Sequence, residues 1–86
     1  MTREQAFVML NDIVRDVLES ECLTVDEATL PASLPGWDKL AEIDVLAAAE
    51  VRFGVRIRAA EAERVRRMGE LVDLILAKAP PLPVGP

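Results

Sequence analysis

The side chains that could do chemistry in this chain are few and scattered. The sequence contains no histidine, so it lacks the commonest general base and the commonest metal ligand. Cys22 is the only cysteine, and no basic partner set accompanies it, so nucleophilic catalysis lacks its usual components. The 15 acidic residues are spread along the chain, at spacings that match no metal motif. We therefore expect no enzymatic activity and no metal site.

The totals indicate one small cytoplasmic domain. The chain has 86 residues, and its lone cysteine cannot form an internal disulfide, which fits a reducing compartment. An acidic residue, Glu4, precedes any apolar run, so the N-terminus does not resemble a signal peptide. No apolar stretch approaches the ~20 residues that a membrane helix needs. The net charge of −5 argues against nucleic acid as a partner. We expect a monomer.

Charge is unevenly distributed along the sequence. Residues 1–51 carry 11 acidic and 3 basic residues, a net charge of −8, whereas residues 52–86 carry 4 acidic and 7 basic residues, a net charge of +3. Six of these basic residues are arginines between Arg52 and Arg67. The segment is either a solvated face or a surface that orients a partner.

Helical spacing predicts a first helix from about Thr2 to Ser20. Thr2 and Gln5 have the form of a capping box. The apolar residues that follow share one stripe at helical spacing: Phe7, Leu10, Ile13, Val14, Val17 and Leu18. Turn-forming residues then predict a long loop, 21–36, anchored by packing of Leu23, Val25, Leu30 and Leu34. We expect Cys22, at the end of the first helix, to be a buried small apolar residue.

A second helix should begin near Trp37 or Asp38, because an aspartate there caps free amides and suits the helix dipole. Its buried stripe is predicted to be Leu40, Ile43, Leu46 or Ala47, and Phe53, and Gly54 should end it. One or two short turns within 59–65 and a last helix over 69–78, which lacks an obvious capping residue at 67–68, complete a domain of residues 1–79. The Pro-rich residues 80–86 should form a flexible tail.

Two short motifs frame the predicted second helix. The chain reads Pro35-Gly36-Trp37-Asp38-Lys39-Leu40 and then Glu50-Val51-Arg52-Phe53-Gly54-Val55. With these motifs, the segment from Trp37 to Ile57 resembles the second helix of acyl and peptidyl carrier proteins. Members of that family often read Pro-Gly-Trp-Asp-Ser-Leu, and their helix ends in Glu-x-x-Phe-Gly-Val. The interval from Lys39 to Phe53 equals the family interval from serine to phenylalanine. The segment 69–75 is also similar to the family's last helix.

The resemblance implies an all-α bundle of three main helices plus a short helix. It also implies that Lys39 occupies the position where the family's serine carries 4′-phosphopantetheine. A lysine amine cannot form the phosphodiester that a serine hydroxyl forms, so we expect no such cofactor on this sequence. In the family, the region around this position and the acidic second helix dock on partner enzymes. The comparable docking residues here are Asp38, Leu40, Glu42, Ile43 and Asp44.

Three functions remain open from the sequence. In the first, the chain is a carrier-like protein that lacks the arm, and the protein itself docks on a thioester-handling synthase, ligase or transferase. Alternatively, it is a genuine carrier whose attachment serine has been replaced at position 39. A third reading is a structural subunit that holds a partner helix or a lipid in a groove between helices. Ser33, six residues upstream in the loop, and Lys39 itself are disfavoured as substitute attachment sites, because Ser33 lies outside the helix start and lysine tethers occur on β-hairpins.

Overall fold

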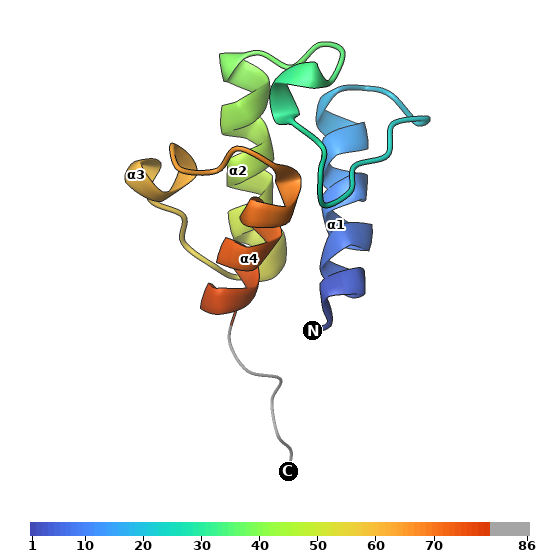
Figure 1. Cartoon of the computed structure of the whole chain (residues 1–86). Helices are drawn as coiled ribbons and strands as arrows, with labels where there is room; N and C mark the ends of the chain where they lie inside the picture. The colour runs from blue at the N-terminus through green and yellow to red at the C-terminus, as the bar shows by residue number, and fades with distance from the viewer. Residues whose placement is uncertain (80–86) are drawn as a thin grey trace.

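The computed structural model describes residues 1–79, and this part of the chain is built from helices and loops. The elements follow in the order α1 (Arg3–Val17), the short 3-10 helix η1 (Pro31–Ser33), α2 (Lys39–Phe53), α3 (Ala59–Ala62) and α4 (Met68–Lys78). Figure 1 shows the three long helices running lengthwise beside one another, with α3 set to one side. The expected all-α bundle of three main helices plus a short one is confirmed. The tail predicted at 80–86 lies outside the described residues.

The first helix begins with the predicted capping box. The Thr2 hydroxyl accepts a hydrogen bond from the Gln5 amide at 3.1 Å, and the Gln5 side chain accepts one from the Thr2 amide at 2.9 Å. The helix ends at Val17, earlier than the predicted Ser20. Glu19 takes a left-handed conformation with φ of 52°, which a continuing helix does not allow.

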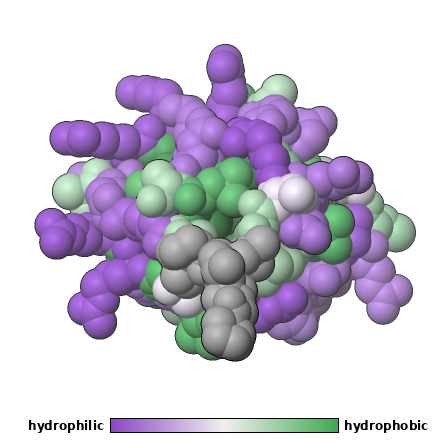
Figure 2. All heavy atoms as spheres, turned by 90° about the horizontal axis from the view of Figure 1, so that it is seen from below, coloured by the Kyte–Doolittle hydropathy of each residue, from purple (hydrophilic) through white to green (hydrophobic). Residues whose placement is uncertain are grey.

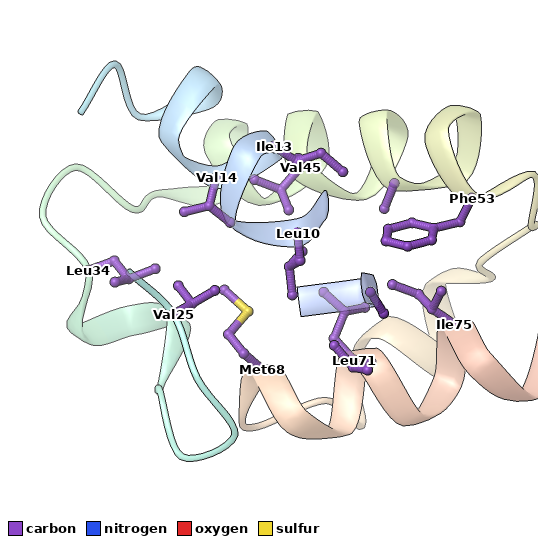
Figure 3. Close-up of a cluster of buried hydrophobic side chains, with 13 residues drawn as sticks. Leu10, Ile13, Val14, Val25, Leu34, Val45, Phe53, Met68, Leu71 and Ile75 are labelled. Carbon is purple, nitrogen blue, oxygen red and sulfur yellow. The ribbon is translucent and has the colours of Figure 1, made fainter. Parts of the chain in front are cut away.

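The core is a contiguous cluster of aliphatic side chains from α1, α2, α4 and the long loop. Figure 3 shows these side chains converging between the helices. Its largest fully buried members are Leu10, Val14, Val45, Met68, Val72 and Ile75. Burying one such side chain contributes about 1.5–3 kcal/mol. No polar or charged residue of the described chain is buried, so the core is entirely apolar.

The predicted buried face of α2 is confirmed at Phe53, whereas Leu46 is half-buried and Ala47 is exposed. Ala41, Val45, Ala49 and Phe53 point into the core, whereas Leu40 is 67% exposed, and Ile43 is also more than half exposed. The sequence misleads here because α2 is apolar around most of its circumference. α2 packs against α1, and two of its four buried residues are alanines.

Asn11 fastens the long loop to α1. The Val25 amide donates to the Asn11 side-chain oxygen at 2.7 Å, and the Asn11 amide group donates to the Val25 carbonyl at 3.1 Å. Val25 and Leu34 are buried as predicted. The predicted burial of Leu30 and of Cys22 is wrong, because Cys22 lies in an exposed turn and Leu30, directly before η1, is 49% exposed.

Main-chain carbonyls from the loop cap the last helix. α4 begins at Met68, one residue before the predicted start, with a hydrogen bond from the Met68 amide to the Thr29 carbonyl at 2.9 Å. The Gly69 amide likewise donates to the Glu27 carbonyl at 3.1 Å. A β-carbon at position 69 would lie 2.8 Å from that carbonyl oxygen, so the contact needs glycine. These acceptors replace the missing serine or threonine cap.

Candidate functional site

The start of α2 is a sharply defined turn into a helix. Gly36 has a φ of 83°, a conformation that suits glycine, and the Trp37 amide then donates to the Leu34 carbonyl. Asp38 is the N-cap residue, and its carboxylate accepts a hydrogen bond from the Ala41 amide at 2.7 Å. The order Pro-Gly-Trp-Asp therefore fixes where the first turn of α2 begins and which side chain it presents.

Lys39 is the first residue of α2 and stands in solvent. Its side chain is 81% exposed, and its amine forms an ion pair with the Glu42 carboxylate at 3.0 Å. Such a surface pair contributes about 0–1 kcal/mol to stability. The site therefore presents an amine and an adjacent carboxylate, with no hydroxyl at the helix start.

The residues predicted to dock a partner lie mostly on the outside of the bundle. Asp38, Leu40, Ile43 and Asp44 are exposed, and Glu42 is half-buried beside Lys39. The structure thus brings two apolar side chains and several carboxylates together on one exposed turn and a half of helix. Contiguous apolar and charged groups of this kind are typical of a protein interface.

The exposed apolar face of α2 extends beyond the predicted residues. Ala47 and Val51 continue it at helical spacing, and Val51 is 83% exposed. A groove between α1 and α2 runs along this part of the helix, lined by Asp12, Ile13, Asp16, Ala47, Ala48, Val51 and Arg52. The sequence analysis missed this continuation because it assigned the exposed side of α2 to the core.

Glu50 is turned away from this face. Its carboxylate accepts a hydrogen bond from the Ile57 amide at 2.9 Å, which ties the segment after α2 back onto the helix. The acidic character of the α2 face therefore comes from its first half.

The start of α2 has no hydroxyl side chain of the kind through which the resembled family attaches its phosphopantetheine arm. The last residue with a hydroxyl group in the sequence is Ser33. Ser33 lies in η1, where its hydroxyl donates to the Leu30 carbonyl at 2.6 Å. No serine, threonine or tyrosine follows it, so α2 and everything after it offer no oxygen for a phosphodiester.

A small, mainly apolar cavity lies where α2, α3 and α4 face one another. Its lining residues come from η1, α2, α3, α4 and the loops next to them. They are Pro31, Trp37, Glu42, Val45, Leu46, Ala62, Val65, Met68 and Leu71. Glu42 supplies the acidic edge of this cavity and also holds Lys39. The start of α2 and the cavity are therefore adjacent.

A cluster around Arg3 joins parts of the chain that are far apart in sequence. The Arg3 guanidinium contacts the carboxylates of Glu27 and Asp73 and the Gly69 carbonyl. Hydrogen bonding from Arg3 holds the pKa of Glu27 below its usual range. Lys78 does the same to the pKa of Glu61, with which it forms an ion pair at 2.8 Å. These pairs tie the loop and α3 to the bundle and leave the α2 face untouched.

Within residues 1–79, no group of three or more histidine, cysteine or carboxylate side chains could hold a metal ion. None of the helices described is long and apolar enough to cross a membrane.

Comparison with known proteins agrees with the geometry. No protein-family model matches the chain, and no curated protein sequence matches it either. Among solved structures, the holo acyl carrier protein of Geobacter metallireducens superposes with a TM-score of 0.78 at 22% identity, over 85% of this chain and 84% of that one. The acyl carrier protein of Thermotoga maritima superposes with a TM-score of 0.76 at 26% identity, over 88% of each chain. The described bundle therefore has the fold of acyl carrier proteins.

Proposed function

We propose that this chain is an acyl-carrier-like protein that docks on a thioester-handling enzyme through α2 without carrying a phosphopantetheine arm. The observation that carries the proposal is Lys39, which stands as the first residue of α2, in the position where the resembled family has its attachment serine. The chain has the fold of a carrier protein but lacks the hydroxyl oxygen to which the arm of a carrier is attached.

The exposed α2 face supports a docking role. Leu40 and Ile43 leave half or more of their surface in water, and covering a large aliphatic side chain is worth about 1.5–3 kcal/mol at most. Asp38 and Asp44 flank them and favour a basic partner surface, mainly through association rate and orientation. Lys39 places one positive charge among these acids, although its pairing with Glu42 offsets it locally.

Intact-mass measurement tests the absence of the arm. The unaltered chain is incubated with coenzyme A and a phosphopantetheinyl transferase of broad specificity, with a known carrier protein as the positive control. We expect no mass gain on this chain. A gain equal to one phosphopantetheine group, at any residue, would reject the proposal.

Charge reversal tests the docking face. The double variant Glu42→Lys and Asp44→Lys is compared with the unaltered chain as bait for partner enzymes from the source cell. A matched control reverses Glu4 and Glu21, two exposed acids away from α2. We expect recovery of an acyl- or aminoacyl-handling enzyme to fall only with the α2 variant. Equal recovery with both variants would show that α2 is not the interface.

A further inference from the structure

The segment that links α2 to α4 carries a second surface, of opposite charge to the first half of α2. Five of its arginines are exposed: Arg56, Arg58, Arg64, Arg66 and Arg67. The ion pairs formed within residues 1–79 use other cations, namely Arg3, Lys39 and Lys78. The guanidinium groups of this segment are therefore left to solvent.

Glu61 in this segment and Glu70 in the first turn of α4 are occupied by other groups, whereas Glu63 is exposed. Glu70 turns its carboxylate to the main chain and accepts hydrogen bonds from the amides of Arg67 at 3.0 Å and Arg66 at 3.3 Å. Glu61 accepts a hydrogen bond from the Arg58 amide and pairs with Lys78. Carboxylates nearby in sequence thus cap helices and leave the neighbouring guanidinium groups unpaired.

Two of these arginines border a hollow that also has an apolar wall. Arg66, Arg67 and Glu70 line it on the side of α4, and Leu30 and Ala32 line it on the side of η1. Leu30 is 49% exposed, although it is a leucine next to the bundle. The hollow therefore offers a half-exposed aliphatic side chain opposite two donors that suit bidentate pairing with carboxylates.

We propose that this hollow binds an acidic segment of a partner protein, in which an apolar side chain is flanked by carboxylates. The apolar side chain covers Leu30, and the carboxylates pair with Arg66 and Arg67. The inference goes beyond the proposed function and does not depend on it, because the α2 face shares no lining residue with the hollow.

The remainder of the molecule favours an acidic protein over a nucleic acid. Single-stranded nucleic acid is held by stacking on exposed aromatic rings, whereas Phe53 is buried and Phe7 and Trp37 pack against the core. Residues 1–51 carry a net charge of −8, which repels a long polyanion. A short acidic segment can avoid that field, because salt screens exposed charges over a Debye length of about 8–10 Å.

The probe for the test is a synthetic peptide with one leucine between pairs of glutamates, titrated into isotope-labelled full-length protein at about 0.1 M salt. We expect backbone amide shifts to concentrate at Leu30, Ala32 and residues 66–70. A glutamine analogue of the peptide should bind at least tenfold more weakly, because it lacks the charges. Shifts confined to other residues, or no binding at about 1 mM peptide, would overturn the proposal.

Matched variants locate the binding. Arg66→Glu with Arg67→Glu should weaken peptide binding about tenfold or more, and Leu30→Ala should weaken it several-fold. The control is Arg52→Glu, an exposed arginine that lines the separate groove between α1 and α2, and it should change the affinity less than twofold. Circular dichroism checks that each variant keeps its helices. Equal loss with the Arg52 control, or tighter binding of an oligouridine RNA at the same hollow, would overturn the assignment.

Discussion

Replacing Lys39 with serine should supply the one group that the start of α2 lacks. The lysine side chain is 81% exposed, and the only ion pair that its amine forms within residues 1–79 is the surface pair with Glu42. Losing that pair costs about 0–1 kcal/mol, and the difference in helix propensity between lysine and serine is a few tenths of a kcal/mol. The Asp38 cap and the core are untouched. We therefore expect the free energy of unfolding of Lys39→Ser to lie within about 1 kcal/mol of that of the unaltered chain.

The assay combines urea denaturation with intact mass after incubation with coenzyme A and the transferase. Lys39→Ser should gain one phosphopantetheine group, mapped by peptide mass to position 39. Lys39→Ala is the matched control, because it loses the same ion pair without adding a hydroxyl, and it should gain nothing. A folded Lys39→Ser that stays unmodified would refute the reasoning, because the start of α2 would then not be a transferase surface. That result would favour the structural subunit over the armless carrier.

Three further outcomes follow from contacts outside the α2 face. Asn11→Ala leaves both main-chain groups of Val25 without their partner at a buried position, so the free energy of unfolding should fall by about 1–3 kcal/mol; an unchanged urea midpoint would contradict this. Gly69→Ala forces a β-carbon to 2.8 Å from the Glu27 carbonyl, and thermal melting should show destabilisation of about 1–3 kcal/mol, with an unshifted midpoint as the contrary result. Arg3 lowers the pKa of the Glu27 carboxyl group. The stabilisation of the fold by the Arg3–Glu27 pair is therefore present above pH 4.5, the ordinary pKa of a glutamate, and is lost as pH falls through the lowered pKa. Arg3→Gln should therefore flatten the acid side of the stability–pH profile, and an identical slope would argue against the pair.

Local signals in the sequence were sufficient for the helix boundaries that depend on local chemistry. Thr2 with Gln5 predicts the capping box, Asp38 predicts the start of α2, and Gly54 ends that helix with a φ of 67° as expected. Each of these depends on residues within a few positions of one another, so the pattern contains the whole interaction.

The rest could not be predicted because it depends on distant partners. Besides Glu70, the start of α4 is capped by carbonyls of residues 27 and 29, which are distant in sequence and leave no local signal near Met68. The orientation of α2 depends on which of its many apolar residues meet α1, and hydrophobicity alone did not separate Ala41 and Val45 from Leu40. This difference matters most for the candidate site, because Leu40 and Ile43 lie on an exposed face of α2 and not in the predicted core.

The position of α3 has a consequence for local unfolding of the bundle. α3 contributes no buried residue to the core, unlike the three longer helices of the described chain. Figure 2 shows one end of the molecule, where hydrophilic side chains surround a more hydrophobic central area. Local unfolding of α3 therefore breaks few apolar contacts. The amide hydrogens of α3 should exchange with solvent through such local unfolding. The amide hydrogens near the buried Leu10 and Val14 should exchange only on global unfolding. We expect local opening of α3 to expose the cavity that Ala62 and Val65 help to line.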